Sequence, residues 1–168
     1  MVGFAAFSGT GKTTLLLKLI PLLRQKNLKM AVIKHAHHGF EVDHPGKDSF
    51  ELRKADACQM LVSSARRKAL ITEFDPDDAE PTLAELIEDL DLGRTDLILV
   101  EGFKREHFSK IELHRQALDK PYLYPGDSDI IALAVDHDLQ TDDLPLLDLN
   151  QPQQIADFIY QNIYLPAT

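Results

Sequence analysis

The chain has 168 residues, and its 27 acidic side chains outnumber the 18 basic ones, which gives a net charge of -9. This length fits one domain that can fold without a disulfide or a metal ion. The acidic balance argues against nucleic acid and against an anionic membrane as partners, because both are bound through clustered lysine and arginine. Cys58 is the single cysteine, so no internal disulfide is expected and a cytoplasmic location is favoured.

The apolar runs of the chain are short. The run at residues 130–135 falls far below the ~20 residues that a membrane-spanning helix needs. The first residues also lack a basic segment ahead of a long apolar stretch. We therefore expect no transmembrane helix and no signal peptide.

Strand-like and helix-like segments alternate in the first third of the chain. The predicted elements are a strand at residues 2–7, a glycine-rich turn at 8–11, a helix at 12–25, a strand at 30–33 and a helix from 48 to about 57. Pro21 should kink the first helix, because proline removes a backbone donor. Asp48 and Glu51 have the spacing of a capping box that opens the second helix.

A β-hairpin is predicted at about residues 60–74. Two strand-like runs, 60–63 and 69–72, flank the basic stretch 65–68, as in a hairpin with a charged tip. Such a hairpin leaves free edges, and free edges are where chains pair. We therefore expect the hairpin to be a dimerisation extension.

The rest of the chain continues the alternation. The predicted elements are a helix from Thr82, with Glu85 completing a capping box, strands at 96–101, 110–114, 130–135 and 146–149, and a closing helix from about 152. The run 110–114 alternates like a strand with one wet face. Alternating strands and helices predict an α/β fold, in which a mostly parallel, doubly wound sheet carries helices on both faces. A single domain is expected over residues 1–168.

Residues 6–13 match the phosphate-loop (P-loop) pattern, except that Ala6 replaces the first glycine. Glycines let backbone N–H groups approach phosphate oxygens, and the following helix directs its positive end at the same anion. Lys12 is expected to serve the β- and γ-phosphates, and the Thr13 hydroxyl to bind Mg²⁺. The expected nucleotide-binding residues of this loop are Ser8, Gly9, Thr10, Gly11, Lys12, Thr13 and Thr14.

The second chemical signal is the acid that ends the strand at 96–101. In a P-loop fold, an acid at the end of a neighbouring strand holds Mg²⁺ or polarises the attacking water. Glu101 is therefore the candidate for both the metal and the catalytic role, beside Lys12. Gly102 would let the chain turn sharply next to the phosphates.

The loop at residues 34–49 is rich in charged and histidine side chains. It follows a strand, so it should lie at the ligand-binding edge of a doubly wound sheet. Asp43 could orient the attacking water, and Lys34 and Lys47 could join Lys12 on a polyphosphate. Zinc or nickel would suit imidazole ligands, but no closed structural site has this spacing, so we interpret the histidines as polar loop residues. They are His35, His37, His38 and His44.

Asp136 ends the strand at 130–135 and could select the base. A carboxylate there would accept from the N1–H and N2–H₂ groups of guanine, which adenine does not offer. The usual Asn-Lys-x-Asp or Thr-Lys-x-Asp motif is absent, since the sequence reads Leu-Ala-Val-Asp at 133–136. From the residues alone, guanine and adenine both stay open.

With these motifs together, the chain resembles the molybdopterin-guanine dinucleotide biosynthesis protein B (MobB) family. The matching segments are the P-loop through Thr14, the histidine-rich run 33–38, residues 42–49 and 51–55, and residues 96–104. The resemblance implies a cytoplasmic, Mg²⁺-dependent GTP-binding accessory protein with weak GTPase activity. It also implies a homodimer that works with the nucleotidyltransferase that makes the dinucleotide.

Two other functions remain open at this point. A small-molecule kinase would use the same loop to transfer a γ-phosphoryl group, but it usually needs an arginine-rich lid, and the best arginine cluster lies on the predicted hairpin. A nickel or zinc metallochaperone GTPase would account for the histidines. Because no arginine finger is evident in the sequence, we expect slow hydrolysis in either GTPase.

Overall fold

The computed structural model describes residues 1–36 and 39–167. The chain forms two compact units. The first unit comprises residues 1–35 and 83–168, and the second comprises residues 36–82. The single domain expected over residues 1–168 stays a prediction.

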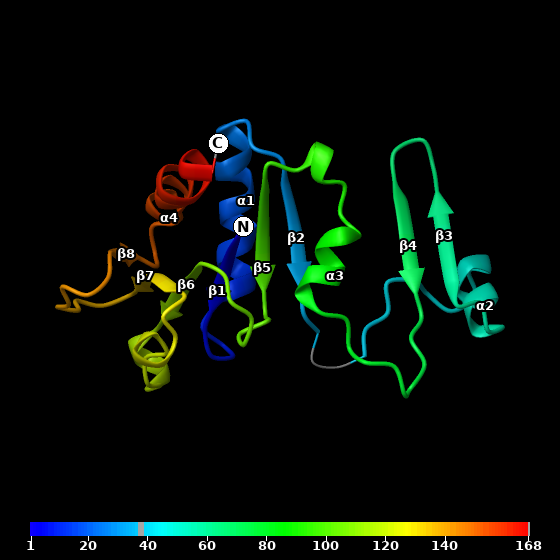
Figure 1. Cartoon of the computed structure of the whole chain (residues 1–168), viewed down its shortest axis with the longest axis horizontal. Coiled ribbons are helices and arrows are strands. Elements are labelled where there is room, and N and C mark those ends of the chain that lie inside the picture. Colours follow the sequence, from blue (N-terminus) through cyan, green and yellow to red (C-terminus); the bar gives the residue numbers. More distant parts are fainter. Residues whose placement is uncertain (37–38, 168) are drawn as a thin grey trace. The chain divides into compact units, whose positions relative to one another are not determined.

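The described residues of the first unit build one six-stranded sheet, in the order β2-β5-β1-β6-β7-β8 (Figure 1). All its neighbouring strands run parallel. The strands are β1 (Val2–Ala5), β2 (Met30–Lys34), β5 (Leu97–Glu101), β6 (Lys110–His114), β7 (Ile130–Val135) and β8 (Leu146–Asp148). The predicted parallel α/β sheet is confirmed, with strand ends that differ by one or two residues.

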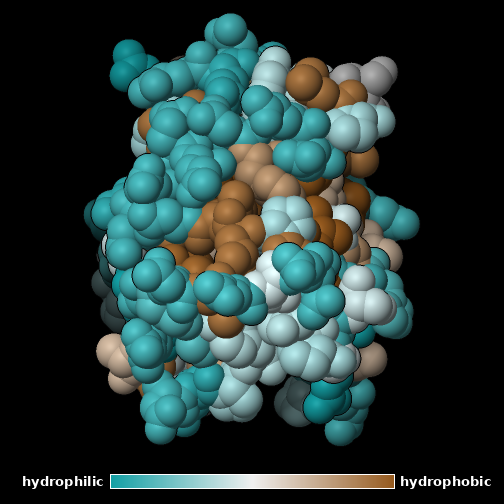
Figure 2. Space-filling view, turned by 90° about the vertical axis from the view of Figure 1, so that its left-hand side faces the viewer, coloured by the Kyte–Doolittle hydropathy of each residue, from teal (hydrophilic) through white to brown (hydrophobic). Residues whose placement is uncertain are grey.

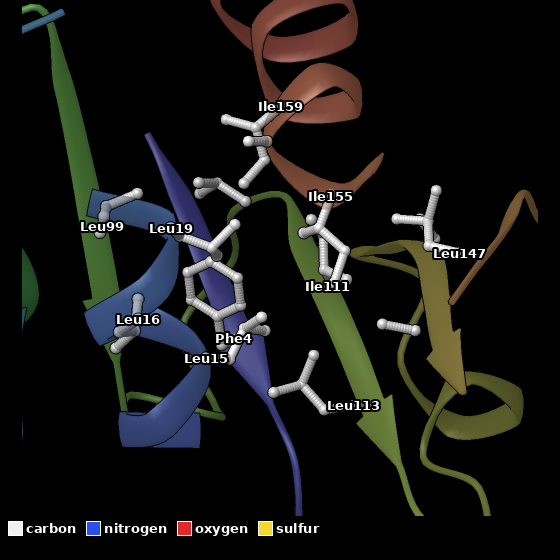
Figure 3. Packing of buried hydrophobic residues seen from close by; sticks show 14 of the residues in the cluster. Phe4, Leu15, Leu16, Leu19, Leu99, Ile111, Leu113, Leu147, Ile155 and Ile159 are labelled. Carbon is white, nitrogen blue, oxygen red and sulfur yellow. The ribbon is translucent and has the colours of Figure 1, made fainter. Parts of the chain in front are cut away.

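One face of this sheet packs against two helices, α1 (Lys12–Gln25) and α4 (Pro152–Ile159). Figure 3 shows Leu19 of α1 and Ile155 of α4 lying over Phe4 and Ile111 of the central strands. These four side chains are almost fully buried. Their contacts hold α1 on the strand that precedes it, which fixes the loop between them.

The opposite face carries two smaller clusters. Leu83 of α3 (Leu83–Glu88) packs with Ile33 and Val100, and a second cluster joins Leu133 to Tyr122 and its neighbours. Successive strand residues point to opposite faces, so the near-continuous burial of β1 and β7 requires both faces to be covered. The doubly wound arrangement is therefore confirmed.

Strand β6 departs from the prediction of one wet face, which is wrong. All five of its residues are buried, because β6 lies between β1 and β7 and the segment after it covers its second face. The ammonium of Lys110 donates to Asp127 at 3.0 Å, and the carboxylate of Glu112 accepts from the backbone N–H groups of Leu123 and Tyr124 at 2.8 and 2.9 Å. The polar side chains of β6 thus hold the segment after the strand in place.

The sheet ends at β8, whose outer edge is unpaired within the described residues. Figure 2 views this side of the first unit and shows a patch of apolar surface bordered by hydrophilic residues. Leu139, Leu146 and Leu147 line a hollow of about 380 Å³ beside the start of α4. No helix of the described residues is long and apolar enough to cross a membrane.

The second unit contains α2 (Asp48–Lys54) and the predicted hairpin, formed by the antiparallel strands β3 (Gln59–Ser63) and β4 (Lys68–Thr72). The capping box predicted for α2 is wrong. Lys47 is the N-cap residue, and the carboxylate of Glu51 accepts from the backbone N–H of Gly46 at 3.1 Å. The helix also ends earlier than predicted, ahead of Asp56 with its positive φ of 78°.

Several short helical turns complete the structure. They are η1 (Leu92–Arg94), η2 (Gln116–Leu118), η3 (Tyr124–Gly126), η4 (Tyr160–Tyr164) and η5 (Leu165–Ala167). The closing helix predicted from residue 152 is confirmed, and it continues from α4 into η4.

We predict that Glu112→Ala lowers the free energy of unfolding by about 2 to 4 kcal/mol, because two buried N–H groups lose their acceptor. The measurement is urea denaturation followed by circular dichroism. Glu106→Ala, which changes an exposed carboxylate, is the control and should change stability by less than about 0.5 kcal/mol. If Glu112→Ala and Glu106→Ala have the same free energy of unfolding, Glu112 does not hold the segment after β6 in place.

Candidate functional site

The glycine-rich turn joins the end of β1 to the start of α1, as the P-loop pattern predicts. Gly9 and Gly11 have φ angles of +83° and +98°, in the left-handed region that favours glycine. The ammonium of Lys12 donates to the carbonyl oxygens of Ala6 and Phe7, both at 3.2 Å. The lysine is therefore held over the loop, at the positive end of the α1 dipole.

A cavity of about 300 Å³ opens on this loop. Its lining residues are Ser8, Gly9, Gly11, Lys12, Thr13, Thr14 and Glu101. The structure thus brings together six of the seven predicted loop residues and the acid predicted from a distant strand. Thr10, the seventh, is buried, and its hydroxyl donates to the carbonyl oxygen of Phe7 at 2.8 Å.

Strand pairing explains why Glu101 reaches the loop. Strand β5 lies beside β1 in parallel, with Glu101 opposite Phe4. The carboxyl ends of parallel neighbours meet at one edge of a sheet. A residue about ninety positions away in sequence therefore faces the same cavity as Lys12.

Three lysines and one carboxylate set the local charge. Burial lowers the pKa of Lys12, and the positive charges of Lys104 and Lys34 lower it further, whereas Glu101 raises it. The ammonium of Lys34 lies 3.5 Å from a carboxylate oxygen of Glu101. Clustered cations attract an anion more strongly than a single one, because their attractions add, and a bound anion also favours the charged form of each lysine.

Lys104 was not among the predicted site residues. Its ammonium lies 5.7 Å from the centre of the Phe7 ring, next to the first turn of the loop. The signal was present in the sequence, since Lys104 ends the segment that begins with Glu101 and Gly102. Because Lys104 lies three residues beyond the strand, the strand pattern did not predict where its side chain points.

Gly102 makes the turn after β5 possible. Its φ is +106°, and a Cβ atom there would lie 2.5 Å from the Cβ of His35. The backbone N–H of His35 donates to the carbonyl oxygen of Glu101 at 2.8 Å. The chain thus passes too closely behind the acid to allow any side chain at position 102.

Thr13 and Glu101 fit the Mg²⁺ site expected in a P-loop fold. Both offer oxygen donors, and both line the same cavity. Mg²⁺ prefers oxygen ligands and in such sites takes few from the protein, since phosphates and water supply the others. Among residues 1–36 and 39–167, no group of three or more His, Cys, Asp or Glu could hold a metal ion. His37 and His38 lie outside the described residues.

Asp43 and Lys47 belong to the second unit. Hydrogen bonds from Ser49 and from the backbone N–H of His44 lower the pKa of Asp43, so its carboxylate is ionised at neutral pH. Lys47 stands at the N-cap of α2. Their predicted approach to the nucleotide would join the two units and stays a prediction.

Asp136 directly follows β7, and both of its carboxylate oxygens have partners. One accepts from the backbone N–H of Gln116 at 3.0 Å, and the other accepts from Arg115 at 3.2 Å. Arg115 also donates through Nε to the carbonyl oxygen of Thr10 at 2.9 Å. Sequence reasoning missed Arg115, although an arginine directly after a strand that borders the P-loop strand was a usable signal. The base-selecting role of Asp136 stays a prediction.

Comparison with known proteins identifies a matching family. The model of the family described as molybdopterin guanine dinucleotide synthesis protein B (MobB) matches residues 1–136. The molybdopterin-guanine dinucleotide biosynthesis adapter protein of Escherichia coli K12 is 49% identical over 162 residues, which cover 96% of this chain and 91% of that protein. The protein of the same name from Haemophilus influenzae is 43% identical over 159 residues, 95% of this chain and 86% of that protein.

Solved structures have the same fold. The crystal structure of a molybdopterin-guanine biosynthesis protein B superposes with a TM-score of 0.71 at 24% identity, covering 94% of this chain and 95% of that one. Bacillus subtilis MobB gives a TM-score of 0.71 at 22% identity, covering 94% and 93%. The family match spans the P-loop, Glu101 and Asp136, and the curated relatives align over nearly the whole chain, so this chain belongs to the MobB family.

Proposed function

We propose that this chain is a GTP-binding adapter in the biosynthesis of the molybdopterin-guanine dinucleotide, with slow Mg²⁺-dependent GTPase activity. One observation carries the nucleotide part of the proposal, namely that the P-loop and Glu101 line a single cavity. The pathway and the adapter role come from the names of the relatives.

The charges of the site suit a triphosphate. Lys12 is held at the start of α1, and Lys34 and Lys104 act on it electrostatically, so all three cations would attract the β- and γ-phosphates. The first turn of α1 begins Lys-Thr-Thr and contains no acid, which leaves the positive helix end free to attract an anion. Guanine is proposed because the relatives are named for a guanine dinucleotide.

Thr13 and Glu101 would hold Mg²⁺ in this proposal. When bound, the ion would neutralise negative charge on the β- and γ-phosphates. Glu101 would orient the attacking water beside the loop, and Lys12 would stabilise charge on the phosphate oxygens. P-loop GTPases without an arginine finger hydrolyse GTP on the order of 10⁻⁴ to 10⁻³ per second, and we propose that range here.

The partner in this proposal follows from the relatives, which are named as adapter proteins of dinucleotide biosynthesis. We propose that the partner is the cytoplasmic nucleotidyltransferase that forms the dinucleotide. Nucleotide occupancy of the P-loop would then regulate that association.

We predict that Lys12→Ala weakens GTP binding by about 100-fold, because the phosphates lose their nearest point charge. Isothermal titration calorimetry with Mg²⁺, using GTP and ATP in competition, measures both the loss and the base preference. Lys18→Ala changes an exposed lysine further along α1 and should bind GTP like the unaltered protein. Unchanged GTP affinity of Lys12→Ala would refute the P-loop assignment.

We predict that Glu101→Gln keeps GTP affinity in the absence of Mg²⁺ and lowers Mg²⁺-dependent hydrolysis about tenfold or more. The amide is nearly isosteric and removes a negative charge that faces the phosphates, so Mg²⁺-free binding should not weaken. Single-turnover release of inorganic phosphate gives the rate, and Glu106→Gln is the matched exposed control. Full hydrolysis by Glu101→Gln would exclude Glu101 from the reaction.

A homodimer built through the hairpin is a further part of the proposal. Leu61 and Leu70 lie opposite each other across β3 and β4 and are 61% and 54% exposed. An isolated two-stranded hairpin is marginally stable in water, and an exposed apolar cross-strand pair favours association. A second copy of the hairpin would cover both residues and pair the free edges.

We predict that the double variant Leu61→Lys, Leu70→Glu shifts the protein from dimer to monomer at micromolar concentration. The opposite charges lie across the strands from each other and so preserve the hairpin, while they remove the apolar contact. Sedimentation velocity gives the mass. Leu92→Glu, an exposed leucine of the first unit, is the control. A monomeric unaltered protein, or a dimeric double variant, would exclude this interface.

A further inference from the structure

Arg115 joins the end of β6 to the P-loop after β1 and to Asp136 after β7. It directly follows β6, its Nε donates to the carbonyl oxygen of Thr10 in the P-loop at 2.9 Å, and its Nη1 donates to Asp136 after β7 at 3.2 Å. The guanidinium is planar and presents its donors in a fixed fork. Two acceptors from separate loops are therefore held at a set distance by one rigid group.

The carboxylate of Asp136, which accepts the hydrogen bond from Arg115, is itself held in place. Its other oxygen accepts the backbone N–H of Gln116 at 3.0 Å and lies 3.3 Å from Nδ1 of His137. The remaining ring nitrogen of His137 lies 3.0 Å from the hydroxyl of Tyr122. The side chains of Asp136 and Arg115 are 18% and 35% exposed, and the linked hydrogen bonds restrict these groups mutually.

The contact with Thr10 falls at the turn of the P-loop. Thr10 is 2% exposed, and its own hydroxyl is used within the loop. The next residue, Gly11, has a left-handed φ, and a Cβ atom there would lie 3.9 Å from both Nε and Nη2 of Arg115. The guanidinium thus rests against the part of the loop where the backbone reverses direction.

An anion-binding loop must direct its N–H groups inward, so its carbonyl oxygens must find partners elsewhere. Lys12 takes the carbonyl oxygens of Ala6 and Phe7 at the beginning of the loop. Arg115 takes the carbonyl oxygen of Thr10 near its end. The two cations together account for the carbonyls on both sides of the expected phosphate position.

We infer that Arg115, anchored by Asp136, is a positioning residue that holds the P-loop in its anion-binding shape. Asp136 then acts through Arg115 on the phosphates of any nucleotide, in place of selecting the base. The inference rests on the proposed nucleotide binding and deepens it. A base-selecting carboxylate directs both oxygens at two N–H donors of guanine, whereas here each oxygen is already directed at a donor of the protein.

The test compares GTP, ATP and inorganic tripolyphosphate, each titrated calorimetrically into the full chain. Arg115→Ala should weaken all three by a common factor of about tenfold, because a preformed loop serves the phosphates alone. Asp136→Asn should weaken all three by a smaller common factor and leave the GTP-to-ATP ratio unchanged. Arg94→Ala, an exposed arginine of η1, is the control.

Three additional measurements separate positioning from general stability. The double variant Arg115→Ala, Asp136→Asn should bind tripolyphosphate no more weakly than Arg115→Ala alone, since Asp136 acts through the arginine. Arg115→Lys should recover part of the affinity, because one donor can still reach Thr10. Thermal unfolding of each variant identifies affinity losses that come from unfolding, and these measurements are made below the lowest melting temperature.

The outcomes distinguish this inference from the proposed function. If the unaltered protein binds none of the three ligands, the nucleotide proposal fails and this inference fails with it. If the unaltered protein binds them and Arg115→Ala binds equally well, the inference alone is overturned. A changed GTP-to-ATP ratio in Asp136→Asn, with tripolyphosphate binding unchanged, would also overturn it and assign Asp136 to the base.

Discussion

The parallel pairing of β1 with β5 is the constraint on which the site depends. It places Glu101 opposite Phe4 and so beside the loop that leaves β1. Burial of Phe4 against α1 fixes the strand and the helix on either side of that loop (Figure 3). The cavity is therefore a consequence of the core. The sheet and the helix determine where the loop begins and ends, and hydrogen bonds from Lys12 and Arg115 act on the backbone between those ends.

The buried polar residues of β6 position a second segment beside the loop. Glu112 holds the segment after β6 through two backbone N–H groups, and that segment begins with Arg115, which contacts the loop. A buried carboxylate is costly unless its hydrogen bonds are made. The arrangement is therefore specific, since displacement of the covering segment would leave Glu112 without partners in the interior.

How far the sequence predicted this structure depended on the range of the interactions. The order of strands and helices and the P-loop follow from local patterns, and Glu101 was found because acids recur at that strand end. The burial of β6 was missed because the sequence Lys-Ile-Glu-Leu-His alternates like a half-exposed strand. Asp127, which accepts from Lys110, and the backbone donors to Glu112 lie 11 or more positions further along the chain. Arg115 was missed for the same reason, since its partners come from two other loops.

The net charge of -9 and an anion site are compatible because the site depends on local geometry. Charges farther away than about 10 Å are largely screened at physiological ionic strength, so the surface acids act weakly on the cavity. At the cavity, the charges of Lys104 and Lys34 lower the pKa of Lys12, and Glu101 offsets part of this repulsion while no phosphate is bound. Glu101 thus has two opposing effects: it stabilises the clustered lysines in the free protein, and it repels a bound phosphate unless a cation lies between them. That opposition is the physical basis of the proposed dependence of nucleotide binding on Mg²⁺ in this chain.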